Sequence, residues 1–220
     1  MKLPPALDTP LLHLLDCHLP VLLAGMGGVA RHELAAAVSR AGGFGVLGMV
    51  REPVERFRYE VEAFRQRTSD RFGVNLIPAA TAPALLKEQV NTCLSLRVPV
   101  IVLFWQVDQA LVKHLKAEGV TVIHQIGSRP EAECAMEAGA DALIVQGYEA
   151  GGHVRGQTST LSLLSEVALD SQVPLIASGG IASGRAMVSA FMLGAQGVSL
   201  GTVFLATQEA NAHSHHKQRV

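Results

Sequence analysis

The sequence has little charge and no surplus of either sign. Lys and Arg number 18 and Asp and Glu number 19, which gives the 220 residues a formal net charge of −1. Proteins that bind nucleic acids or anionic membranes usually carry a basic surplus. We therefore expect no nucleic-acid or membrane partner, and a small-molecule substrate instead. The 49% of hydrophobic residues excludes a disordered chain.

Cysteine is scarce. Cys17, Cys93 and Cys134 are odd in number, far apart and in no Cys-x-x-Cys pair, so neither a disulfide framework nor a zinc site is expected. The simplest interpretation is that all three are buried or non-functional thiols in a reducing cytosol.

Long hydrophobic runs are lacking as well. No uninterrupted apolar stretch reaches the roughly 18 residues that a membrane span requires. Charged residues and prolines interrupt residues 1–28, so this stretch is not predicted to be a signal peptide. These absences predict a soluble, cytoplasmic protein, and they leave a homo-oligomer open.

Familiar catalytic patterns are missing too. No carboxylate pair has the spacing of a glycoside hydrolase, no Gly-x-Ser-x-Gly elbow occurs, and no His and acidic cluster suggests a metal. The groups that carry out a reaction are therefore expected to come from elsewhere than these motifs.

Short apolar runs recur along the chain. Rich in Val, Ile and Leu and without alternation, they resemble parallel strands covered on both faces. The runs are residues 21–26, 44–49, 72–77, 98–105, 120–127, 142–147, 174–180 and 197–202, and helical spacing follows at 33–41, 54–67, 83–96, 109–118, 131–138 and 184–193. Successive runs begin 22 to 32 residues apart, the repeat of a TIM (β/α)8 barrel.

A doubly wound open sheet is the alternative fold. Such a sheet commonly begins with a Gly-x-Gly-x-x-Gly turn that binds a dinucleotide. The one match, at Gly43, Gly45 and Gly48, runs through the second apolar run and opens no helix. We interpret it as chance and expect a single barrel domain over residues 1–220.

Polar residues gather at the carboxyl ends of the predicted strands, where TIM barrels keep their active sites. Asn75, Gln125 and Gln146 each place an amide in an apolar run. A buried amide without a partner costs roughly 1–3 kcal/mol. These three amides therefore require either a polar ligand or, as the alternative, one another.

Glycine-rich turns end the last two predicted strands. The turns contain Ser178, Gly179, Gly180, Ser199, Leu200, Gly201 and Thr202. Barrels commonly hold a phosphate at these two positions, because glycine lets the backbone N–H groups approach the anion. Flavin mononucleotide (FMN) suits such a site, since its phosphate, ribityl chain and ring match the turns, the amides and a glycine-lined floor.

The longest gap between predicted strands carries the expected catalytic residue. Gly151 and Gly152 precede His153 there. The glycines leave room for a planar ligand, and the imidazole above it can transfer a proton or bond to a developing charge. His153 is the main candidate, and His124 is the second.

Six segments together resemble the nitronate monooxygenase family, which are FMN-dependent barrels. The segments are residues 24–28, 72–76, 124–128, 146–153, 178–181 and 201–207, and the resemblance runs from about Thr9 to Lys217. It implies that His153 is the family's active-site histidine. The strand ends and the resemblance together place the following residues at the cofactor: Ala24, Gly25, Met26, Asn75, Gln125, Gln146, Gly151, Gly152, Ser178, Gly179, Gly180, Ser199, Leu200, Gly201 and Thr202.

The resemblance also implies a reaction. In such enzymes the flavin takes an electron from an alkyl nitronate, O2 combines with the resulting radicals, and a carbonyl compound and nitrite are formed. The closest alternative is an FMN- and NAD(P)H-dependent enoyl-acyl carrier protein reductase, which shares the Gly-Gly-His loop. A further alternative is a flavin-binding barrel without catalytic activity.

The sequence departs from the family after the last predicted strand. Family members usually continue well beyond this point as a final helix and a helical cap, whereas 18 residues follow Thr202 here. We therefore expect the final helix and the cap to be short or missing, residues 203–220 to be a truncated tail, and FMN retention to be weakened.

Overall fold

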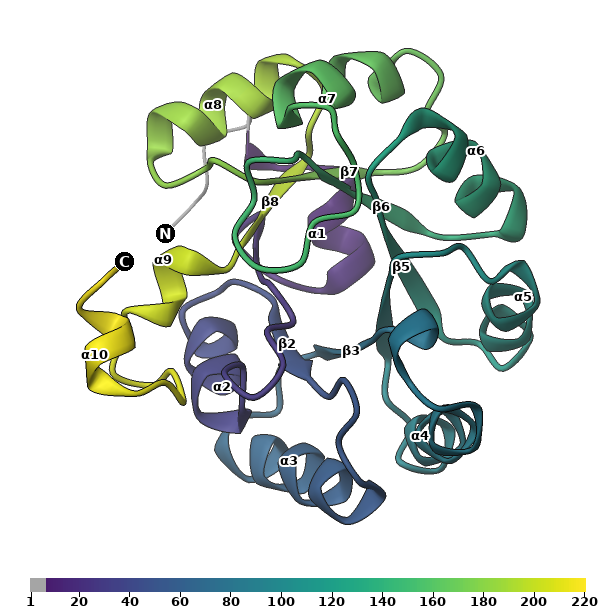
Figure 1. The fold of residues 1–220 in the computed structure, drawn as a ribbon, viewed down its shortest axis with the longest axis vertical. Coiled ribbons are helices and arrows are strands. Elements are labelled where there is room, and N and C mark those ends of the chain that lie inside the picture. Colours follow the sequence, from purple (N-terminus) through teal and green to yellow (C-terminus); the bar gives the residue numbers. More distant parts are fainter. Residues whose placement is uncertain (1–6) are drawn as a thin grey trace.

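Strands and helices alternate along the chain and form a TIM barrel (Figure 1), as predicted. The structure is a computed structural model and describes residues 7–220. The eight parallel strands are β1 (Val21–Leu23), β2 (Gly45–Gly48), β3 (Phe72–Leu76), β4 (Val100–Phe104), β5 (Thr121–Ile126), β6 (Ala142–Gln146), β7 (Leu175–Ser178) and β8 (Gly197–Leu200). The expected domain and the N-terminal stretch judged not to be a signal peptide both include residues 1–6, which lie outside the described residues.

A helix follows each strand. The helices are α1 (Pro10–Leu15), α2 (His32–Arg40), α3 (Val54–Arg67), the 3-10 helix η2 (Pro78–Ala80), α4 (Pro83–Ser95), α5 (Gln109–Ala117), α6 (Arg129–Ala138), α7 (Thr160–Ala168), α8 (Gly184–Met192), α9 (Thr202–Leu205) and α10 (Ser214–Lys217). The four-residue α9 confirms the expected short final helix. None of the helices in residues 7–220 is long and apolar enough to cross a membrane.

The sheet closes on itself. Its strand order is β1-β8-β7-β6-β5-β4-β3-β2, and a parallel bridge between Leu22 and Phe44 joins the first strand to the second. The Leu23 amide donates to the Phe44 carbonyl at 2.9 Å, and the Phe44 amide donates to the Val21 carbonyl at 2.9 Å. This closure excludes the open doubly wound sheet.

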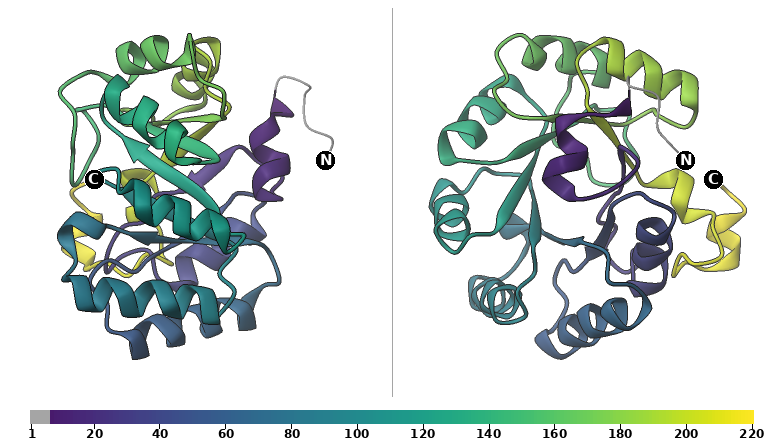
Figure 2. Two further views of the ribbon diagram at one scale, coloured as in Figure 1. Left: turned by 90° about the vertical axis from the view of Figure 1, so that its right-hand side faces the viewer. Right: turned by 180° about the vertical axis from the view of Figure 1, so that it is seen from behind.

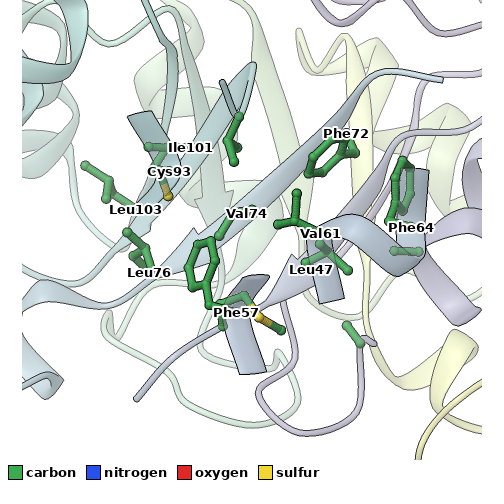
Figure 3. Close-up of a cluster of buried hydrophobic side chains, with 14 of the residues drawn as sticks. Leu47, Phe57, Val61, Phe64, Phe72, Val74, Leu76, Cys93, Ile101 and Leu103 are labelled. Carbon is green, nitrogen blue, oxygen red and sulfur yellow. The ribbon is translucent and has the colours of Figure 1, made fainter. Parts of the chain in front are cut away.

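Successive side chains of each strand enter two different apolar layers. One layer fills the barrel, where Leu11 and Leu15 of α1 meet Phe44 and Ile123. The other lies between strands and helices, and Figure 3 shows its part around β2, β3 and β4. Seen from behind in Figure 2, α1 crosses the centre of the barrel. Since α1 fills the end where the strands begin, the opposite end is left for a site.

The C-terminal segment returns to the start of the barrel. The Asn211 amide donates to the Val29 carbonyl at 3.2 Å, and the Asn211 side chain donates to the Gly28 carbonyl at 2.7 Å. Ala210 is buried beside these contacts in the layer around α2. Part of the expected tail, residues 203–220, thus packs against the connection between β1 and α2.

Cys17, Cys93 and Cys134 are free thiols in the described residues. Burial, helped by the neighbouring Asp16, raises the pKa of the Cys17 thiol to about 11. Burial likewise raises the pKa of Cys93 above its usual range. Both groups therefore stay protonated thiols at neutral pH.

The glycines of the Gly-x-Gly-x-x-Gly match allow neighbouring backbone to pack closely against β2. A Cβ atom added at Gly45 would lie 2.2 Å from the Ala35 carbonyl oxygen of α2, and one at Gly48 would lie 2.3 Å from the Met26 carbonyl oxygen. These contacts let α2 and the segment after β1 approach the strand closely. The pattern opens no helix, as expected.

We expect Gly45→Ala to lower the free energy of unfolding by about 1–3 kcal/mol, because the backbone of α2 must move away from the added methyl group. Urea denaturation followed by circular dichroism measures the change. Gly184→Ala is the matched control, since its added Cβ meets nothing within 4 Å at the start of α8 and Ala favours helices over Gly. Similar losses in both variants would contradict this account.

Candidate active site

Five polar side chains line the open end of the barrel. They belong to Asn75, Gln125, Gln146, Ser178 and Ser199, and all continue the inward-facing alternation of their strands. The strand register sets Gln146 beside Ser178 and Ser178 beside Ser199. The structure thus brings together the strand-end residues that the sequence singled out.

The amides do not satisfy one another. The Asn75 Nδ2 group donates to the Val102 carbonyl at 3.2 Å, and the Gln146 Nε2 group donates to the His153 carbonyl at 2.9 Å. The Gln146 Oε1 atom is buried and has no hydrogen-bond partner among the described residues. A buried acceptor of this kind calls for a donor from a ligand.

The segment after β1 lies between β3 and β8. A Cβ atom added at Gly25 would be 2.2 Å from Cβ of Asn75, and one at Gly201 would be 3.4 Å from Sδ of Met26 and 3.5 Å from Cβ of Ala24. Residues 24–26 and the turn after β8 therefore share one wall of the site.

The turn after β7 has a shape that needs glycine. Gly179 and Gly180 have φ values of 112° and 66°, in the left-handed region that side chains disfavour. The Thr160 hydroxyl donates to the carbonyl groups of Ser178 and Gly179 at 3.0 and 3.1 Å. These bonds fix the turn and direct its backbone toward the mouth of the barrel.

One residue of the turn after β8, Leu200, does not direct its side chain toward the site as the sequence had suggested. Ser199 is buried on the inner face, and Thr202 begins α9. The Leu200 side chain instead packs outward against the layer between strands and helices. Only the Leu200 backbone faces the segment after β1, where its carbonyl accepts from the Ala24 amide at 2.9 Å.

The long loop after β6 reaches over the turns of β7 and β8. A Cβ atom at Gly151 would lie 2.7 Å from the Thr202 hydroxyl oxygen, so loop and turn are in contact. Gly152 adopts a φ of 78° just before His153. Beyond the histidine, the Arg155 Nε group pairs with Glu131 Oε1 at 2.7 Å, which fastens this end of the loop to α6.

Trp105 is the site residue that sequence reasoning did not assign. The exposed His153 ring meets the Trp105 ring edge-on, with centroids 5.6 Å apart and planes at 83°. Trp105 has a φ of 72°, which is strained for a bulky residue, and such strain is concentrated at functional sites. Its place at the end of a predicted strand, as the chain's single tryptophan, was the available signal.

His124 does not belong to this group, contrary to expectation. It pairs in register with Leu103 and Leu143, which face the helices, so its side chain points away from the barrel interior. It is 1% exposed, and burial lowers the pKa of its imidazole. The sequence did not show which face of β5 His124 occupies, because both faces are buried and the surrounding residues are apolar on both.

A separate cluster joins α2 to α3. His32 Nδ1 lies 2.7 Å from Glu60 Oε2, and His32 Nε2 lies 3.0 Å from Glu33 Oε1. The ligand atoms of His32, Glu33 and Glu60 are close enough to bind one metal ion. The sequence did not reveal this cluster, because His32 and Glu60 are 28 residues apart and meet only in the fold. Arg31 and Arg56 also approach Glu60, at 3.9 and 3.6 Å, and make this a network of ion pairs.

The sequence profile of nitronate monooxygenase matches residues 8–220. The chain belongs to the nitronate monooxygenase family. It is 30% identical over 245 residues to a probable nitronate monooxygenase of Staphylococcus aureus, covering 92% of this chain and 69% of that protein. It is 37% identical over 209 residues to the Rhodococcus jostii (3aS,4S,5R,7aS)-5-hydroxy-7a-methyl-1-oxo-octahydro-1H-indene-4-carboxyl-CoA dehydrogenase, covering 93% of this chain and 57% of that protein.

Solved structures share this fold. FabK from Thermotoga maritima superposes with a TM-score of 0.92 and 37% identity, over 96% of this chain and 67% of that one. Nitroalkane oxidase from Streptomyces ansochromogenes superposes with a TM-score of 0.87 and 29% identity, over 94% and 71%. The chain therefore spans between about half and three quarters of the length of these relatives.

The buried His124 predicts a loss of stability in mild acid. Because its pKa is lower in the folded state, the unfolded chain takes up a proton first as pH falls below about 6.5, the ordinary histidine value. The free energy of unfolding should decrease from that pH down to the lower folded pKa. His124→Gln should lack this part of the decrease.

Urea denaturation of both proteins at several pH values between about 7.5 and 5 measures the difference, since the acidic residues and the other histidines contribute equally to the two curves of unfolding free energy against pH. Parallel curves would mean that His124 is not the group responsible.

Proposed function

We propose that the mouth of the barrel binds FMN. The observation that carries the proposal is the buried, unpartnered Gln146 Oε1 atom, which can accept a hydrogen bond from the flavin ring. Asn75 and Ser178 line the same inner face and add polar groups for the ribityl chain. The set consists of amides, hydroxyls and glycines. One carboxylate, Glu149, lies beside Gly180, and its Oε1 atom accepts a hydrogen bond from the Thr160 amide at 2.9 Å.

The proposed phosphate position is at the turns after β7 and β8. Gly179 and Gly180 have no side chain to hinder an anion, Gly201 precedes a helix start, and Thr202 offers a hydroxyl. Ala24, Gly25 and Met26 then form the wall beside this position, and Gln125, Gly151, Gly152, Ser199 and the Leu200 backbone complete the proposed contacts.

The proposed reaction is the oxidation of an alkyl nitronate with O2 to a carbonyl compound and nitrite. Bound FMN supplies the one-electron chemistry, and the protein supplies binding and orientation. A nitronate is already deprotonated, so His153 acts as a hydrogen-bond and charge partner of its oxygens rather than as a base. Trp105 orients the imidazole through their edge contact, and Gln146 holds the His153 backbone.

The likeness to FabK favours a second candidate, an FMN- and NAD(P)H-dependent enoyl-acyl carrier protein reductase. The likeness to the Rhodococcus jostii indene-carboxyl-CoA dehydrogenase points in the same direction, toward a thioester substrate. A flavin-binding barrel without activity is the third candidate. The three differ in what they consume and release, so one set of assays separates them.

The purified protein should be yellow, and it should release nitrite from propionate 3-nitronate under air. His153→Ala should keep the flavin absorbance and lose about 100-fold or more of the turnover, as expected for the loss of a bond to a developing charge. His114→Ala, which removes an exposed histidine of α5, is the matched control. NADPH oxidation with crotonyl thioester and no nitrite would instead establish the reductase.

Gln146→Leu should weaken FMN binding by about tenfold, because the variant lacks both the acceptor for the flavin and the donor to the His153 carbonyl. Flavin fluorescence during titration of the protein freed of FMN measures this. Gln196→Leu is the control: Gln196 also has a buried, unpartnered Oε1 atom, but it precedes β8 at the opposite end of the barrel. Equal effects of the two changes would refute the assignment of Gln146.

A further inference from the structure

A groove of about 760 Å³ lies beside the mouth of the barrel, along the connections after β3, β4 and β5. It is lined by Pro78, Ala79, Thr81, Pro83, Leu86, Gln106, Val107, Asp108, Pro130, Glu131, Cys134 and Arg155. In the closed strand order β4 is four places from β8. The groove is therefore opposite the glycine-rich turns proposed for the phosphate.

The walls of the groove are preformed. Pro78 begins η2, Pro83 begins α4, and Pro130 lies in the first turn of α6, so the ring of each proline fixes the backbone. The Asp108 carboxylate accepts from the Leu111 amide at 3.0 Å and caps α5. A rigid groove binds its ligand without an ordering cost for these segments.

Protein groups already pair the carboxylates in the groove. Glu131 accepts from Arg155 Nε at 2.7 Å and from the Gly127 amide at 2.9 Å. Asp108 is occupied with the cap of α5. The remaining lining consists largely of prolines, Ala79, Leu86 and Val107. Since the carboxylates have partners, the lining favours an uncharged, apolar occupant.

Two residues that line the groove are close in sequence to the proposed catalytic residues. Gln106 follows Trp105, whose ring contacts the His153 ring at 5.6 Å. Arg155 follows His153 by two residues in the same loop, lines the groove and pairs with Glu131. A substrate held by its polar end at His153 can therefore extend its other end into the groove.

We propose that this groove binds the apolar tail of the substrate, so that the enzyme acts on nitronates with a chain or ring of several carbons. This inference rests on the proposed nitronate oxidation. Cavities of about 300–1,000 Å³ typically hold drug-sized ligands. A nitronate of two or three carbons would leave most of the 760 Å³ empty, whereas a longer tail would bury apolar surface against Leu86 and Val107.

The test uses straight-chain carboxylates from acetate to octanoate, planar anions that resemble nitronates and are not turned over. Trp105 is the single tryptophan and precedes Gln106, so its fluorescence reports binding without any reaction. The dissociation constant should fall by about fourfold for each methylene group that enters the groove. Nitronates of the same lengths, followed by nitrite release, should show a matching rise in kcat/KM.

Ala79→Phe should fill the groove and abolish the gain with chain length, while binding of acetate persists and shows that the variant is folded. Ala84→Phe is the matched control, because Ala84 lies exposed on α4 outside the groove lining. The inference would be overturned if Ala79→Phe still bound longer carboxylates more tightly than shorter ones. It would also be overturned if the affinity of the unmodified protein did not rise with chain length. NADPH binding that Ala79→Phe prevents would also overturn it and assign the groove to a dinucleotide.

The same experiment separates the two proposals. Carboxylate affinity that rises with chain length, without nitrite from any nitronate, would support the groove and refute nitronate oxidation. Nitrite release that is independent of chain length would support nitronate oxidation and refute the groove.

Discussion

The closure of the sheet between Leu22 and Phe44 is the constraint on which the rest of the structure depends. A closed barrel allows each strand only two faces, one toward the interior and one toward the helices. Because the interior is filled with apolar side chains and α1 covers one end, the inward polar residues meet at the other end. Gln146, Ser178 and Ser199 become neighbours through this geometry although they are far apart in sequence.

Much of this arrangement could be predicted from the sequence. The eight apolar runs located all eight strands, since strands buried on both faces consist of continuous Val, Ile and Leu. The polar residue that ends such a run marks the carboxyl end of its strand. This rule led to Asn75, Gln146 and Ser178 without knowledge of their contacts.

The same continuity of apolar residues hid the direction of individual side chains. A one-residue change in phase sends a side chain to the opposite face, so neither His124 nor Leu200 could be assigned to a face from the pattern. The contact of Trp105 with His153 was out of reach for another reason. It depends on the path of a loop that Gln146, Glu131 and neighbouring glycines hold in place.

The Asn211 contacts with the segment after β1 have a consequence for how the protein forms. The side-chain bond to Gly28 joins residues 183 positions apart. Contacts of such long range form slowly because a large loop must first be closed. During synthesis, the wall of the mouth that contains Met26 gains this support only after Asn211 has emerged from the ribosome. The proposed binding surface at this wall is therefore among the last parts of the barrel to form.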